Sequence, residues 1–380
     1  MSLRRCLFVL SADFGEYVTA SVFSRGQPFE SHFALPARIA RYAGDALDNA
    51  TVYAGIEELR AIAERVQPDV VALCSGYLFA VNGLIAPAAL ARWMAELRGR
   101  GMAVATTDPW LRIWSMKPGA RLAIHSVRKG GVDAALSEKM SRLQAGLEDM
   151  FRDVPHLFAV PLPATRDTWM SFYNPQFTAG SEVAGRKGKA DGLDDWLFVL
   201  SREDYVFLAG FEGERFFRAL EDRVAELAAY DGNRLTFIGP PEMGRFFSDR
   251  LAGRPRVTYL PFCDFTAFEW AVRRAKIVAY WNVLSASLLY CLYYRVPPIF
   301  LGRGHQARVC DGLFEHVAEW VYRGRPPDLI DLNAPFGTRA DALIERRGIR
   351  AWLDSINRNY AQAPTPATVV ERVIAHYAGR

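Results

Sequence analysis

Short apolar runs alternate with amphipathic stretches along the first half of the chain. The runs Cys6–Leu10, Val70–Cys74 and Met102–Thr106 have the length and composition of buried strands. Between them, Ile56–Val66 and Pro87–Arg98 carry apolar residues at helical spacing and charges on the opposite side. Strands that alternate with helices predict βαβ units, a parallel sheet and right-handed crossovers.

The alternation stops and then resumes in the second half. Residues 166–194 are rich in Gly, Lys and Asp, which predicts a linker or a mobile loop. A long helix is expected over Gly213–Ala229, and helical spacing after Thr365 predicts a C-terminal helix within 361–380 that packs back on the N-terminal domain. The strands expected in this half are Trp196–Leu200, Leu235–Ile238, Val257–Leu260, Ile277–Tyr280 and Pro298–Leu301.

These patterns predict an α/β chain with two Rossmann-like, doubly wound parallel-sheet domains that face a cleft. The length of 380 residues suits two cores. The expected domains are 1–165 and 195–360.

Composition narrows the class of protein. With 51% hydrophobic and 23% charged residues the chain is globular, and a net charge of +4 gives no case for a nucleic-acid partner. The five cysteines are scattered, so neither disulfides nor a zinc site is predicted, and we expect a reducing, cytoplasmic location. The uncharged stretch Ile277–Tyr294 holds Asn282 and two serines near its middle, which favours a buried strand, loop and helix over a membrane span.

In open parallel sheets, ligands bind beyond the carboxyl ends of the strands. After the first strand the chain reads Asp13-Phe14-Gly15-Glu16, where Glu16 or Asp13 could act as a general base. The alternative is that Asp13 caps the following helix and Glu16 offsets its dipole. Ser75 and Asp108 follow the next two strands and leave room for a ligand.

The segment 257–306 carries the most detailed pattern. Ser285-Ala286-Ser287 precede a predicted helix, where hydroxyl and amide groups suit a diphosphate. Arg303 lies between two glycines after the next strand and could reach the same negative charge. No D-x-D pair follows a strand, so no metal is expected.

This succession resembles the donor half of glycosyltransferase-B enzymes. In that resemblance Ser285–Ser287 match the phosphate-contacting turn, Val296-Pro297 the aliphatic-proline step, His305-Gln306 the pair that contacts the sugar, and Pro261–Phe265 the loop that contacts the base. Gly15-Glu16 falls where many members carry Gly-His, the histidine being the catalytic base. The chain departs from the family in three places, one of which is the loop Ser201–Asp204, which is not glycine-rich. Tyr290 replaces a ribose-binding glutamate, and Arg295 replaces a glycine.

The resemblance implies an acceptor-side N-terminal domain and a nucleotide-sugar-binding C-terminal domain. It implies metal-independent transfer of a sugar from a nucleotide-sugar donor to an unidentified acceptor, without a cofactor. The alternatives are a nucleotide-sugar hydrolase or epimerase of the same fold, and a non-catalytic binding protein. The expected donor-binding residues are Arg202, Gly239, Phe262, Asp264, Ser285, Ser287, Arg303, His305 and Gln306; those on the acceptor side are Phe14, Gly15, Ser75 and Asp108.

Overall fold

The computed structural model describes residues 3–43, 48–108, 147–162, 167–178, 195–230, 233–254, 256–309 and 312–378. Its contacts divide the chain into two compact units. The strands β1–β7 and the chain from Arg358 onward belong to the first unit, and β8–β12 belong to the second. Among the described residues, no helix is long and apolar enough to span a membrane.

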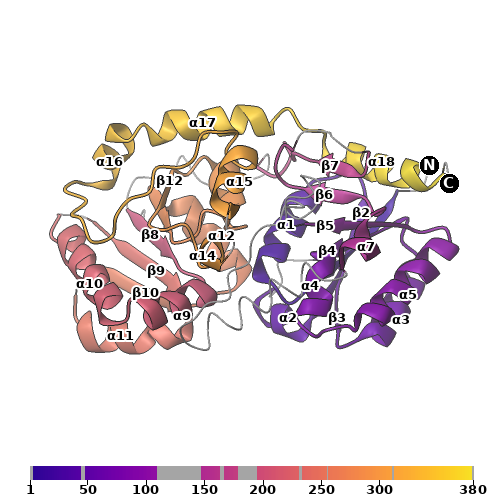
Figure 1. Ribbon diagram of the computed structural model, residues 1–380, viewed down its shortest axis with the longest axis horizontal. Coiled ribbons are helices and arrows are strands. Elements are labelled where there is room, and N and C mark those ends of the chain that lie inside the picture. The colour runs from indigo at the N-terminus through magenta and orange to yellow at the C-terminus, as the bar shows by residue number, and fades with distance from the viewer. Residues whose placement is uncertain are drawn as a thin grey trace. The chain divides into compact units, whose positions relative to one another are not determined.

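The first unit is built on a seven-stranded parallel sheet in the order β3-β2-β1-β4-β5-β6-β7 (Figure 1). Its strands and helices follow in chain order. They are β1 (Arg5–Leu10), α1 (Phe14–Ser24), β2 (Glu30–Pro36), α2 (Ala37–Ala43), β3 (Ala50–Tyr53), α3 (Ile56–Val66), β4 (Val70–Cys74), α4 (Gly76–Val81), α5 (Pro87–Gly99), β5 (Ala103–Thr107), α7 (Leu147–Phe151), β6 (His156–Phe158), β7 (Trp169–Ser171) and, from the C-terminus, α18 (Pro366–Ala378).

The second unit repeats the plan with five parallel strands in the order β10-β9-β8-β11-β12. Its core joins the sheet to the flanking helices, and the rings of Phe198 and Phe237 stack at 4.3 Å on neighbouring strands. The elements are β8 (Trp196–Val199), α9 (Arg202–Phe211), α10 (Glu214–Ala228), β9 (Leu235–Gly239), the 3₁₀ turn η1 (Pro241–Met243), α11 (Gly244–Arg250), β10 (Val257–Pro261), α12 (Phe265–Arg274), β11 (Ile277–Tyr280), α13 (Leu288–Tyr294), β12 (Pro298–Phe300), α14 (Gln306–Val309), α15 (Leu313–Trp320), α16 (Ala340–Arg346) and α17 (Ile349–Tyr360).

Each sheet has one topological switch point, where the strand order reverses. In the first sheet it lies between β1 and β4, and in the second between β8 and β11. In open parallel sheets, ligands bind beyond the carboxyl ends of the strands at such a switch point. The residues that follow these strands are therefore the ones that the fold places at a ligand site.

The C-terminal helix is anchored to the first unit. The Tyr377 hydroxyl donates to the carbonyl oxygen of Val104 in β5 at 2.8 Å, and Arg4 Nε lies 3.0 Å from a carboxylate oxygen of Glu371. Within the range 166–194 that the sequence predicts as a linker, Trp169–Ser171 forms β7 and pairs with β6. Residues 179–194 lie outside the described residues.

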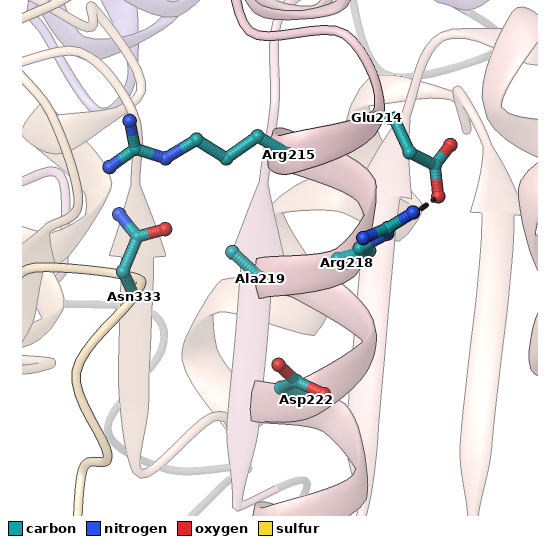
Figure 2. Close-up of a pocket in the computed structure, with 6 residues that line it drawn as sticks. All are labelled: Glu214, Arg215, Arg218, Ala219, Asp222 and Asn333. Atoms are coloured by element: carbon teal, nitrogen blue, oxygen red, sulfur yellow. Dashed lines mark hydrogen bonds and ion pairs between the residues drawn. The ribbon is translucent and has the colours of Figure 1, made fainter.

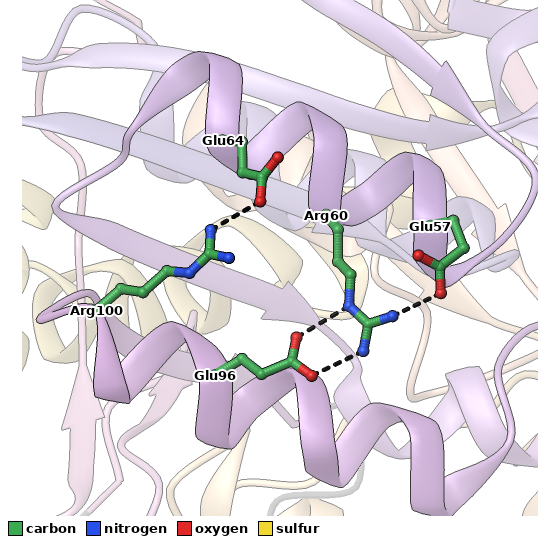
Figure 3. Close-up of polar contacts among 5 residues, drawn as sticks. All are labelled: Glu57, Arg60, Glu64, Glu96 and Arg100. Carbon is green, nitrogen blue, oxygen red and sulfur yellow. Dashed lines mark hydrogen bonds and ion pairs between the residues drawn. The ribbon is translucent and has the colours of Figure 1, made fainter.

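Surface ion pairs connect the two helices α3 and α5 of the first unit (Figure 3). Arg60 binds both carboxylate oxygens of Glu96 at 2.9 and 2.8 Å and also contacts Glu57, while Arg100 lies 3.0 Å from Glu64. All these groups are partly or fully exposed, so each pair adds little to the stability of the fold.

Candidate functional site

Glu16 is buried at the switch point of the first sheet. It occupies the first turn of α1, directly after β1, and only 4% of its surface is exposed. The Ser75 hydroxyl donates to Oε1 of Glu16, and the Thr107 hydroxyl donates to Oε2 at 2.7 Å. Ser75 follows β4 and Thr107 ends β5, so one carboxylate joins three neighbouring strand ends.

Strand register explains why these three residues meet. Leu10 pairs with Cys74, and Leu73 pairs with Thr106, so the positions just beyond those pairs lie at the same edge. The Ser75 backbone N–H donates to the Thr107 hydroxyl oxygen at 2.7 Å, which ties the two outer partners together.

A glycine makes this packing possible. A Cβ on Gly76 would lie 2.6 Å from the Phe151 ring and 2.8 Å from the Thr106 hydroxyl oxygen. The Gly76 N–H donates to that same oxygen at 3.0 Å. A larger residue at position 76 would therefore push β4 away from β5.

The electrostatics of Glu16 differ from those of a surface carboxyl. Burial raises its pKa from 4.5 to about 7, against the hydrogen bonds from Ser75 and Thr107, which lower it; the charges of Asp13 and Asp108 raise it further. A carboxyl group with this pKa exchanges its proton near neutral pH, the range in which a general base is most effective.

Asp13 and Phe14 lie just before Glu16 on the same segment. Asp13 occupies the N-cap position of α1, but its side chain makes no capping hydrogen bond, so the capping interpretation of Asp13 was wrong. The Phe14 ring packs edge-on against Tyr42, with centroids 5.0 Å apart, and the Arg38 guanidinium lies 5.5 Å from its centre. Gly15 accepts a hydrogen bond from Thr19 through its carbonyl oxygen. Asp108 is 4% exposed and follows Thr107 directly.

The second sheet carries a similar acidic residue that the sequence did not single out as a site. Asp204 is buried in the first turn of α9, after β8, and its backbone N–H donates to Ser201 at the N-cap. Its Oδ1 accepts hydrogen bonds from the backbone N–H and from Nδ1 of His305, at 2.9 and 2.6 Å. The signal that could have found Asp204 is the Ser-x-x-Asp pattern immediately after a strand.

His305 is consequently not open to solvent. It is 6% exposed, and its Nδ1 lies 2.6 Å from the buried carboxylate of Asp204. Burial alone would raise the pKa of Asp204, but the charge of His305 and the hydrogen bonds from His305 and Ser201 hold that pKa below its ordinary value. Gly304 comes before it with φ +92°, and a Cβ there would overlap the side chain of Asn282.

The serine turn after β11 is partly closed by its own backbone. The two hydroxyl oxygens of Ser285 and Ser287 lie 2.8 Å apart, and both residues are half-buried. The first amides of α13 donate back into this turn, from Leu288 to the Ser285 carbonyl at 3.0 Å and from Tyr290 to the Ser287 carbonyl at 3.1 Å. These amides, which the sequence suggested for a diphosphate, are therefore already bonded to the turn.

The remaining expected donor residues have local partners. Arg202 pairs with Glu242 at 2.6 Å, and the exposed Arg303 lies 4.3 Å above the Phe314 ring. Asp264 caps α12, because its Oδ1 accepts the N–H of Ala267 at 2.8 Å. Three further residues complete the set. Gly239 ends β9 and accepts the N–H of Phe262 at 3.0 Å, Phe262 has φ 28°, and Gln306 starts α14.

A pocket of about 320 Å³ lies elsewhere, on the outer side of α10 (Figure 2). Glu214, Arg215, Arg218 and Asp222 follow one another along this helix, and Asn333, on a loop, lies on the same side of the helix as Arg215. Arg218 lies 3.3 Å from Glu214, so charges of both signs already pair within the pocket. In the part of the chain that the structure describes, no group of three or more His, Cys, Asp or Glu side chains could hold a metal ion.

Comparison with known proteins identifies solved structures with a similar fold. No family model matches the chain, and no curated protein does. A UDP-N-acetylglucosamine 2-epimerase from Rickettsia bellii superposes with a TM-score of 0.54 at 10% identity, over 100% of this chain and 98% of the other. The spinosyn rhamnosyltransferase complexed with thymidine diphosphate gives 0.51 at 13% identity, over 97% and 99%. The chain has the glycosyltransferase-B fold.

A third structure agrees with this result. The glycotransferase of kitacinnamycin has a TM-score of 0.51 at 12% identity, and the match covers 99% of this chain and 100% of the other. The predicted pair of parallel Rossmann-like sheets is thereby confirmed. Because glycosyltransferase-B structures include transferases and epimerases, the fold alone does not choose between the two reactions.

Proposed function

We propose that the chain is a nucleotide-sugar enzyme that transfers a sugar to an acceptor hydroxyl, with Glu16 as the general base. The observation that carries this proposal is the buried carboxylate at the switch point of the first sheet. Its pKa of about 7 suits proton transfer at neutral pH. Asp13, on the same turn, is the other carboxylate considered for this role.

In the proposed step, Glu16 takes the proton of the acceptor hydroxyl as its oxygen bonds to the anomeric carbon. The bond from that carbon to the donor diphosphate breaks, and the electron pair leaves with the diphosphate. The groups proposed to stabilise the leaving charge follow the strands of the second sheet, namely the hydroxyls of Ser285 and Ser287 with Arg303. The thymidine diphosphate in the rhamnosyltransferase structure supports a nucleoside diphosphate as the ligand class.

The first experiment is a thermal-shift panel of nucleoside diphosphates and nucleotide-sugars. A ligand at about a hundred times its Kd stabilises the protein by about 2.7 kcal/mol, which moves the unfolding temperature by several degrees. A selective response to one base is expected. A flat panel up to millimolar concentrations would instead favour a non-catalytic binding protein.

The role of Glu16 is tested by the Glu16→Gln variant with the donor found in that panel. Turnover should fall by about 10²- to 10⁴-fold while the donor-induced thermal shift persists, because the amide cannot accept the proton. Turnover in the wild type should rise as the pH increases through about 7. Asp13→Asn is the matched variant, and a loss confined to it would move the base to Asp13.

Epimerisation is the second candidate, supported by the 2-epimerase structure that superposes on this chain. The two reactions separate when the donor is incubated without an acceptor. An epimerase or hydrolase converts the donor at full rate alone, whereas a transferase needs the acceptor. Full conversion without an acceptor would reject transfer.

A further inference from the structure

Two hydroxyl groups hold the Glu16 carboxylate from neighbouring strand ends. The Ser75 hydroxyl contacts Oε1 and the Thr107 hydroxyl contacts Oε2. The exposed fractions of Ser75 and Thr107 are 0% and 6%, so solvent does not compete for these bonds. Neither residue shares an element with Glu16.

The direction of the hydrogen bonds follows from counting protons. The Thr107 oxygen already accepts the Ser75 backbone N–H, so its own single proton is available to Glu16. The Ser75 hydroxyl likewise donates its single proton. These two hydrogen bonds favour the ionised form of Glu16. If Glu16 were protonated, the proton on its carboxyl oxygen would point at a hydroxyl that already donates its own proton to that oxygen.

The backbone of Ser75 adds to this arrangement. Its φ of 52° and ψ of 62° lie in the left-handed region, which residues with a Cβ seldom adopt because it strains the backbone. That conformation directs the Ser75 backbone N–H to Thr107 while the side chain reaches Glu16. The turn between β4 and α4 therefore adopts a strained backbone conformation that places the Ser75 hydroxyl on the Glu16 carboxylate.

We propose that Ser75 and Thr107 are positioning residues that fix the Glu16 carboxylate in one orientation and keep it ready to accept a proton. This proposal rests on the role of Glu16 given above and assigns Ser75 to the base rather than to the acceptor. The other titratable groups that face Glu16 are Asp13 at the N-cap of α1, Asp108 after β5 and Cys74 in β4. The two acids oppose ionisation of Glu16, and the two hydroxyls favour it.

The test is a direct titration of Glu16 in protein labelled with ¹³C at the glutamate carboxyls, with Glu16→Gln to assign the signal. Ser75→Ala and Thr107→Val should each move the midpoint upward from about 7 by about one pH unit, because each removes a bond to the charged form. Ser75→Gly removes the hydroxyl together with its Cβ but tolerates the left-handed backbone, so it checks that a shift in Ser75→Ala does not come from backbone strain. Thr107→Ser keeps the hydroxyl and should restore the midpoint.

The matched control is Ser21→Ala, a buried hydroxyl on α1 that bonds Arg25 instead of Glu16. Its midpoint should equal that of the wild type. Unchanged midpoints in Ser75→Gly and Thr107→Val would overturn the proposal. The titration needs no substrate, so an upward shift in a protein without transferase activity would support the positioning role and reject transfer.

Discussion

At the residue scale, two buried acids define this molecule. Glu16 and Asp204 occupy the first turn of the helix after the first strand of their sheets, and both bond to residues from other strand ends. Their partners differ, since Glu16 faces neutral hydroxyls and Asp204 faces the imidazole of His305. Both acids are buried, but the pKa of Glu16 is raised by its burial, whereas the contacts of Asp204 with His305 lower the pKa of Asp204.

The raised pKa of Glu16 predicts a pH-dependent stability. Between its ordinary value of 4.5 and about 7, the unfolded chain has lost this proton while the folded chain retains it. The stabilisation is complete below 4.5 and is lost as the pH rises through 7, with a total of about 3 kcal/mol. Urea unfolding of the wild type and of Glu16→Gln at pH 4.5 and pH 8 should show this difference.

Glu57→Gln, at an exposed position on α3, is the control for that measurement and should follow the wild type at both pH values. Parallel curves for Glu16→Gln and the wild type would mean that Glu16 is ionised without cost in the folded protein.

The ion pair of Asp204 with His305 predicts strong coupling between the two side chains. His305→Asn removes the imidazole that bonds the buried carboxylate of Asp204 and should destabilise the protein by about 3–5 kcal/mol. The double variant with Asp204→Asn should lose much less than the sum of the single losses. A double-mutant cycle in urea measures this coupling, and additive losses would show that the pair contributes no mutual stabilisation.

At the element scale, the edge between β4, α4 and β5 depends on close packing. Gly76→Ala should cost about 1–3 kcal/mol, because the new methyl group meets the Phe151 ring and Thr106. Gly99→Ala is the matched control, since nothing lies within 4 Å of a Cβ there and its helix gains up to about 1 kcal/mol. Calorimetry should show a lower unfolding temperature for Gly76→Ala and an equal or higher one for Gly99→Ala. An unchanged unfolding temperature for Gly76→Ala would show that α7 can move to make room for the methyl group.

The strands that the sequence predicted are those with continuous apolar runs. β1, β4, β5 and the five strands of the second sheet fall where the pattern placed them. The pattern missed four strands of the first sheet. β2 begins with the polar residues Glu30, Ser31 and His32, β3 has one buried position, and β6 and β7 have three residues each. Pairing with neighbours, rather than local composition, makes these segments strands.

The same limit applies to the site. The rule that ligands bind after parallel strands selected Glu16, Ser75 and Asp108, and the structure joins the first two by a hydrogen bond. The bridging role of Thr107 depends on the register of β4 against β5, which no local pattern contains. The partner of His305 lies 101 positions earlier in the chain, so its ion pair could not be read from the sequence.

At the scale of the whole molecule, the chain is two similar halves whose stabilities depend on different charges. The ionised form of Asp204 stabilises the second unit, and this contribution disappears as the pH falls through the lowered pKa of Asp204. Glu16 acts on the first unit in the opposite direction. Acid therefore favours one half and weakens the other.

Each half thus carries, after its first strand, an acid that makes its stability depend on pH. Through Glu16, a high pH lowers the stability of the N-terminal half. Through Asp204, a low pH lowers the stability of the C-terminal half. Two side chains thus give the halves of this chain opposite responses to pH.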